Sequence, residues 1–159
     1  MMSEEKNICG LGGWLILVGL GLVITPFRVI ATTFPIYQEI FASGTWDTLT
    51  TEGTEFYSQF WAPIILGEVF INACLVIAGF IMLFLFFTKN KFFPKLYIGV
   101  AVFSLIFIII DAFSISLVLP NEPIFDPETT KELARALAQV LIWVPYMLVS
   151  KRVKATFIN

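Results

Sequence analysis

Four long apolar stretches dominate this chain and restrict the folds that it can adopt. They cover about residues 11–31, 62–87, 95–119 and 132–149. Each is close to the roughly 20 residues that a helix needs to cross the hydrocarbon core of a bilayer. Away from their ends, the stretches hold only four charged residues, which are Arg28, Glu68, Asp111 and Arg135. This pattern predicts four transmembrane helices.

The composition supports a membrane protein over a soluble one. Hydrophobic residues make up 58% of the chain and charged residues 14%, against roughly 45–50% and 25% in ordinary globular proteins. Backbone groups in lipid must bond within their own helix or in a closed barrel, and the stretches lack the alternation of barrel strands. We therefore predict an all-α, integral membrane, four-transmembrane-helix bundle, with residues 1–159 as a single membrane domain.

The distribution of Lys and Arg predicts the orientation of the helices. The connection between the second and third stretches holds Lys89, Lys91 and Lys95, the C-terminal tail holds Lys151, Arg152 and Lys154, and Lys6 lies near the start. The other two connections hold Lys131 and eight acids, which are Glu39, Asp47, Glu52, Glu55, Glu122, Asp126, Glu128 and Glu132. By the positive-inside rule both termini are expected in the cytoplasm. Residues 35–60 then form an extracytoplasmic loop, in which residues 54–60 are a candidate short interfacial helix.

Several classes of chemistry have no support in the sequence. The chain has no His and only two Cys, which lie far apart. Without these ligands and bases, we expect no metal site, no cofactor and no catalytic residues, and hence no enzyme. The formal net charge of -2 gives no reason to expect a nucleic-acid partner.

The polar residues inside the apolar stretches are the main candidates for a functional site. A charge within a bilayer costs several kcal/mol unless it is paired or hydrated. Arg28, Glu68, Asp111 and Arg135 all lie in the outer halves of their stretches, and Asn72 is one helical turn from Glu68. We predict that these five residues form one intramembrane polar network without net charge. Such a network either fixes the packing of the helices or serves as an ion or proton relay or a polar substrate site.

The two ends of the chain carry recognisable runs. Gly12-Gly13-Trp14-Leu15-Ile16-Leu17 opens the first stretch, Ile142-Trp143-Val144-Pro145-Tyr146 closes the fourth, and Ser150-Lys151-Arg152-Val153-Lys154-Ala155-Thr156-Phe157 follows. Together they resemble the bacterial family known as domain of unknown function 2569. The resemblance covers nearly the whole chain. It implies a small inner-membrane protein with four helices, and it implies no mechanism.

The C-terminal run is a second candidate site. Its basic residues suit the negative end of a helix dipole and anionic headgroups, and Phe157 is expected to dip into the membrane interface. The run is a candidate anchoring motif or a docking motif for a partner. Its residues are Trp143, Pro145, Tyr146, Ser150, Arg152, Thr156 and Phe157.

Two classes of function follow from these features. The first is a non-enzymatic accessory or assembly subunit that binds other membrane proteins in a bacterial inner membrane. The second is a minimal oligomeric transporter or an ion or proton pathway that uses Glu68, Asn72, Asp111 and the two arginines. An outward-open polar cavity that reaches Glu68 and Asp111 would favour transport, and a dry, fully paired cluster would count against it. The expected partners are the lipid bilayer and either another membrane protein or further copies of this chain.

Overall fold

The computed structural model describes residues 9–159, and Lys6 lies outside this part of the chain. Every regular element in this part is a helix. The helices in chain order are α2 (Trp14–Ala42), α3 (Thr45–Thr50), α4 (Trp61–Phe87), α5 (Phe93–Ile115), α6 (Pro127–Val149) and α7 (Lys151–Thr156). Four of them, α2, α4, α5 and α6, are long and apolar enough to cross a membrane. The all-α fold with four membrane-spanning helices is therefore confirmed.

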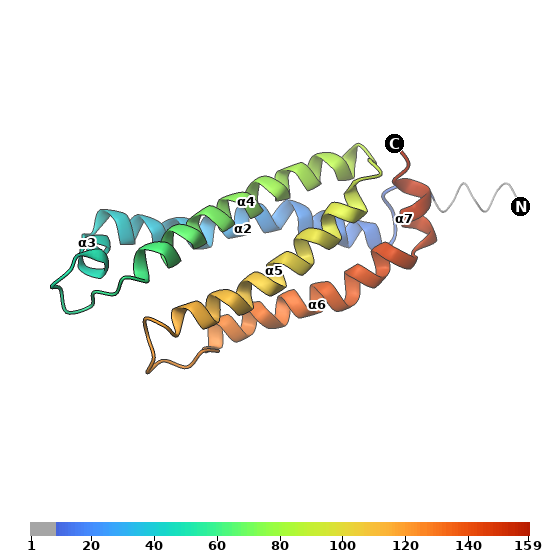
Figure 1. Cartoon of the computed structure of the whole chain (residues 1–159). Coiled ribbons are helices and arrows are strands. Elements are labelled where there is room, and N and C mark those ends of the chain that lie inside the picture. The colour runs from blue at the N-terminus through green and yellow to red at the C-terminus, as the bar shows by residue number, and fades with distance from the viewer. Residues whose placement is uncertain (1–8) are drawn as a thin grey trace, which may run out of the picture.

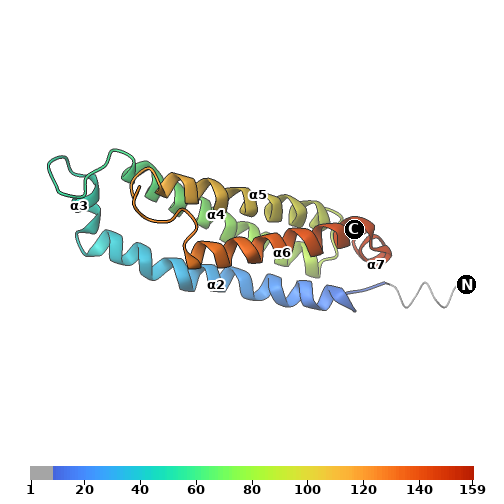
Figure 2. The same ribbon diagram turned by 90° about the horizontal axis from the view of Figure 1, so that it is seen from below.

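The four long helices form two antiparallel hairpins. Helix α2 packs on α4, α5 packs on α6, and α4 joins the two hairpins through its contact with α5. Figure 1 shows the hairpins close together at the end that carries α7 and the C-terminus, and further apart at the opposite end. We call these the closed end and the open end. Figure 2, turned by 90°, shows α7 and the turn between α4 and α5 at the closed end, with α3 at the open end.

The first long helix extends past its predicted end. It continues from residue 31 to Ala42 and passes through Pro35, so the expected loop over residues 35–60 is shorter. The only helix inside it is α3, at Thr45–Thr50 and not at residues 54–60. Pro35 removes one helical hydrogen bond, but Tyr37, one half-turn later, is held by side chains of α4. The contact of Tyr37 with α4 compensates for the helical hydrogen bond that is lost at Pro35.

The third and fourth helices are also shifted from their expected bounds. Helix α5 ends at Ile115 where the apolar pattern continues to residue 119, because residues 116–118 form a turn. Helix α6 begins at Pro127, five residues earlier than the expected residue 132. Asp126 accepts a hydrogen bond from the Thr129 amide at 2.6 Å and caps this helix, and proline is favoured at the first helical position.

The core of the protein lies at the closed end. Its largest side chains are aromatic: Phe93 is fully buried, and its ring stacks on Phe157 with centroids 4.6 Å apart. Phe86 meets both rings at 5.2 and 5.8 Å. Aliphatic residues from α2 and α7 complete the cluster, including Leu15, Val18, Leu22 and Val153. All four long helices and α7 therefore share one core at this end.

Two glycines allow α2 and α4 to approach closely. A Cβ on Gly19 would lie 2.9 Å from the Phe86 ring, and a Cβ on Gly79 would lie 2.7 Å from the Pro26 ring. Close approach at small residues is a usual way for membrane helices to associate. These contacts fix the first hairpin along the half of its length that leads to the closed end.

Candidate functional site

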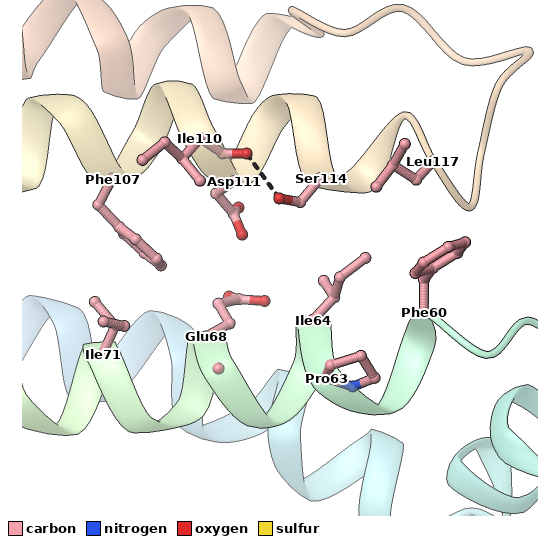
Figure 3. A pocket seen from close by; sticks show the side chains of 11 residues that line it. Phe60, Pro63, Ile64, Glu68, Ile71, Phe107, Ile110, Asp111, Ser114 and Leu117 are labelled. Carbon is pink, nitrogen blue, oxygen red and sulfur yellow. Dashed lines mark hydrogen bonds between the residues drawn. The ribbon is translucent and has the colours of Figure 1, made fainter.

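A pocket lies between α4 and α5 towards the open end. Its volume is about 320 Å³, and Glu68 and Asp111 are its two acidic residues. Figure 3 shows their carboxylates directed toward each other from the two helices. The rest of the lining is mainly apolar and includes Phe60, Ile64, Ile71, Phe107 and Leu117. The pocket therefore combines two half-buried carboxylates with a hydrophobic wall.

Helix α2 contacts Glu68 through the side chain of Tyr37. The Tyr37 hydroxyl donates to Glu68 Oε1 at 3.1 Å, and Asn72 Nδ2 donates to the same hydroxyl at 2.7 Å. Because Glu68 and Asn72 are one turn apart on α4, a single side chain from α2 can reach both. This chain of hydrogen bonds fixes the rotamer of Glu68 and leaves its second oxygen free to act in the pocket.

A third carboxylate adds to the negative charge at this height. Glu132 of α6 lies close enough to interact electrostatically with both Glu68 and Asp111. The described residues hold no ion pair between any of these acids and Arg28 or Arg135, and the side chains of both arginines are exposed. The charged residues that line the pocket are Glu68 and Asp111, and neither arginine lines it.

The position of Arg28 along α2 explains its separation from Glu68. Nine residues separate Arg28 from Tyr37, which is a rise of about 13 Å along the helix. Since Tyr37 marks the height of Glu68, Arg28 lies well below the acidic site. The structure thus brings Glu68, Asn72 and Asp111 to one place. The complete five-residue network stays a prediction.

Sequence reasoning missed Tyr37. We assigned it to a loop because Pro35 precedes it, so its side chain was not considered for the interior. The signal that could have found it is its spacing from Thr33 and Val29, which continues one helical face past the proline.

The chemistry available at the pocket is binding through carboxylates. Within residues 9–159, no group of three His, Cys, Asp or Glu side chains is placed to hold a metal ion. Carboxylates in an apolar pocket attract a cationic group, because pairing offsets the cost of keeping them away from water. A protonated amine or a guanidinium is thus the complementary ligand.

The two terminal runs meet in space at the closed end. The Trp14 ring contacts the Trp143 ring edge-on at 6.2 Å, and Trp143 contacts Tyr146 at 5.9 Å. Thr156 is buried: its hydroxyl accepts from the Gly10 amide at 3.0 Å and lies 3.2 Å from the Gly10 carbonyl, to which it donates. Helix α6 continues unbroken through Pro145 to Val149. The two runs that carry the family resemblance therefore bind each other.

The glycines of the first run make room for an arginine of the last. A Cβ on Gly12 would lie 2.9 Å from Arg152 Nη1, and a Cβ on Gly13 would lie 3.6 Å from Arg152 Nε. Gly13 also has φ of 59°, in the region that favours glycine. Ser150 caps α7 by accepting from the Val153 amide at 3.4 Å. Each of these residues serves the junction between the two ends of the chain.

Phe157 lies in the core, whereas the sequence predicted that it dips into the membrane interface. Only 6% of its surface is exposed, and its ring is stacked on Phe93. Beyond it, the Asn159 carbonyl accepts from the Lys91 amide at 2.7 Å, and Asn159 Nδ2 donates to the Thr88 carbonyl at 3.2 Å. The tail packs inward because the turn between α4 and α5 offers both an aromatic surface and free backbone groups.

Comparison with known proteins gives the family of the chain. The family model described as "Protein of unknown function (DUF2569)" matches residues 8–158, a range that includes both terminal runs and the pocket. The chain belongs to this family. No match was found among curated proteins or among solved structures. The chain is thus a DUF2569 protein with four helices that are long and apolar enough to cross a membrane. The description of the family assigns no activity.

Proposed function

We propose that this DUF2569 protein is a non-enzymatic accessory or assembly subunit that binds another membrane protein at its open end. The single observation that carries the proposal is the acidic pocket between α4 and α5, which no cation of the described chain fills. The complementary occupant is a transmembrane helix of the partner that carries a Lys or Arg. Its side chain would pair with Glu68 and Asp111, while its apolar faces would cover the hydrophobic wall.

The contrast with the closed end supports binding over transport. Below the pocket, Phe86, Phe93 and Phe157 pack into one aromatic cluster. A continuous polar path through one chain would have to cross this cluster, which contains no charged group. This apolar cluster at the closed end supports a binding site over a channel through a single chain.

The proposal includes the location and orientation of the protein. The cationic residues of the turn between α4 and α5 lie at the same end as those of α7, and the acids of the other two connections lie at the open end. By the positive-inside rule, the closed end would face the cytoplasm of a bacterium and the open end would face outward from the inner membrane.

Site-specific photocross-linking tests the proposal. A photoreactive phenylalanine analogue is placed at Phe107 in the pocket and, as a matched control, at Phe84, which is 67% exposed on α4. We expect Phe107 to cross-link to a transmembrane segment that contains Lys or Arg, and Glu68→Gln with Asp111→Asn to abolish that product. Cross-linking to lipid alone, or equally from both positions, would overturn the proposal.

A second function, transport, has two observations in its favour. The first is that the pocket reaches Glu68 and Asp111 and no cation of the described chain lines it, although most of its lining is apolar. The second is the chain of hydrogen bonds from Asn72 through Tyr37 to Glu68, beside Asp111, which is of the kind that proton relays use. The purified protein in liposomes would then carry a proton or cation flux that Glu68→Gln abolishes. Absence of flux in vesicles that contain correctly folded protein would reject this alternative.

A further inference from the structure

The closed end carries a concentration of positive charge. Its cations lie in the turn between α4 and α5, at the start of α5 and in α7, and they are Lys89, Lys91, Lys95, Lys151, Arg152 and Lys154. Among the described residues at this end, which are 9–13, 88–95 and 150–159, no side chain is acidic. Because the formal net charge of the whole chain is -2, the positive charge is a local property of this end.

Contacts of the C-terminal tail bring the cations of α7 and those of the turn to one surface. The Asn159 carbonyl accepts from the Lys91 amide at 2.7 Å, and the Asn159 amide donates to the Lys89 carbonyl at 3.4 Å. Figures 1 and 2 both show α7 at the same end as this turn. We call this surface the basic face, and its exposed cations are Lys89, Lys91, Lys151 and Lys154.

Lys89 occupies a backbone position where glycine is usual. It directly follows Thr88, which ends α4, and its φ is 56°. Within residues 9–159 it is the only residue other than glycine with a positive φ. Helices commonly end with Gly or Asn in this left-handed conformation, because a longer side chain there is strained. A lysine kept at a strained position favours a role for its side chain beyond ending the helix.

Apolar side chains beside the lysines place the basic face at the level of lipid headgroups. Phe87 is 61% exposed, Phe92 57% and Ile158 69%, and the Lys91 ammonium lies 5.9 Å from the centroid of the Phe92 ring. Exposed apolar groups at the end of membrane-spanning helices contact acyl chains, whereas lysines extend their ammonium groups to the headgroups. A phospholipid therefore matches both parts of this surface, and a soluble anion matches only the lysines.

We propose that the basic face binds the phosphate groups of anionic phospholipids in the leaflet at the closed end. The ammonium groups of the turn and of α7 would share the phosphates, and Phe87, Phe92 and Ile158 would contact the acyl chains. The bound lipid would thus bridge the turn between α4 and α5 to α7, at the end where the two hairpins are joined. This inference concerns the end opposite the pocket and does not depend on the proposed function.

Native mass spectrometry of the full-length protein tests the proposal. The protein in mild detergent is equilibrated with equal amounts of phosphatidylglycerol and phosphatidylethanolamine, and the lipids that it retains are counted. We expect it to retain at least about fivefold more phosphatidylglycerol, since each lysine near an anionic surface contributes about fivefold to binding.

Two pairs of substitutions test whether the turn and α7 form one site. Lys89→Gln with Lys91→Gln, and Lys151→Gln with Lys154→Gln, should each reduce the retained phosphatidylglycerol at least about tenfold. The matched control is Lys131→Gln, which removes an exposed lysine at the start of α6, at the open end. This control should leave the retained lipid unchanged.

Lys89→Gly separates lipid binding from folding. Glycine relieves the strain at this position, so the unfolding temperature should stay the same or rise. The retained phosphatidylglycerol should still fall about fivefold, because the ammonium group is lost. This variant keeps the proposal testable if either double variant fails to fold.

Three results would overturn the proposal. Equal retention of the two lipids would exclude a site for anionic phospholipids, and a loss from only one pair of lysines would exclude a shared face. Displacement of phosphatidylglycerol by an equal concentration of inorganic phosphate would show that free phosphate is the ligand. Because no protein partner is present and the pocket is unchanged in every variant, these results are independent of the photocross-linking at the open end.

Discussion

The closed end and the open end of this DUF2569 protein are built from the same four helices but differ in what lies between the two hairpins. At the closed end, α7 and the residues that precede α2 fill the space between the hairpins with buried side chains and hydrogen bonds. At the open end, no terminal segment within residues 9–159 lies between the hairpins, and a pocket with two carboxylates is present. The difference shows that the chain uses its own ends to fill the space at one side, whereas an acidic pocket remains at the other.

The largest expected effect is at the closed-end core. Phe157→Ala should lower the free energy of unfolding by about 3–5 kcal/mol, because it removes a buried ring that stacks on Phe93. The matched control is Ile158→Ala, since Ile158 is 69% exposed where Phe157 is 6% exposed. Thermal unfolding in mild detergent measures both. A similar loss for the two variants would mean that the tail does not pack in the core.

A smaller effect is expected where α2 crosses α4. Gly79→Ala should cost about 1–3 kcal/mol, because the new Cβ would lie 2.7 Å from the Pro26 ring and force the helices apart. Gly67→Ala is the control on the same helix, where a Cβ meets nothing within 4 Å. If denaturation in detergent shows the two variants to be equally stable, the close crossing does not exist as described.

At the open end, the polar contacts should contribute less to stability. Tyr37→Phe removes the hydroxyl that joins Glu68 and Asn72, and we expect a loss of about 0.5–1.5 kcal/mol. Tyr57→Phe is the control, because the Tyr57 hydroxyl also donates to a glutamate, Glu52 Oε1, but over a longer 3.4 Å and in an exposed connection. A loss from Tyr37→Phe as large as that from Phe157→Ala would reverse the comparison, with the open end as the more stable part.

The smallest effect is a local dependence on pH at the start of α6. The hydrogen bond from the Thr129 amide lowers the pKa of Asp126. A lowered folded pKa stabilises the helix start above the unfolded pKa, near 3.9, and this stabilisation is lost as the pH falls through the lower folded value. Hydrogen exchange at Thr129 should therefore be slower in the native protein than in Asp126→Asn at neutral pH. The difference should vanish in strong acid, and a difference that does not change with pH would contradict this role of the carboxylate.

Much of the fold could be predicted because a lipid bilayer allows few kinds of backbone structure. Apolar stretches of the right length must be helices, so the four spans follow from the sequence alone. The bounds were less predictable, since the continuation of α2 through Pro35 depends on Tyr37 contacting α4. The helical spacing of Val29, Thr33 and Tyr37 favours this continuation, but the contact that stabilises it joins residues 31 positions apart and cannot be predicted from local sequence.

The candidate site was predictable in part for the same reason. Glu68 and Asn72 share a face because they are one turn apart on one helix, and Asp111 joins them because the turn between α4 and α5 brings α5 back antiparallel to α4. The height of Arg28 was predicted wrongly because α2 continues to Ala42, which places Arg28 in the middle of the helix and not near its outer end. The roles of Thr156 and Phe157 were missed because a short basic tail after a span resembles an interfacial anchor until its tertiary contacts are known.

The most direct test of the difference between the two ends is thiol accessibility in native membranes. In the Cys9→Ser, Cys74→Ser background, Ser114→Cys places a thiol in the pocket and Thr156→Cys places one in the closed end. We predict that a water-soluble maleimide modifies the first at least about tenfold faster than the second, because exposure controls thiol reactivity. Equal rates, or faster modification at position 156, would contradict the claim that the closed end is packed and that the pocket at the open end is accessible to water.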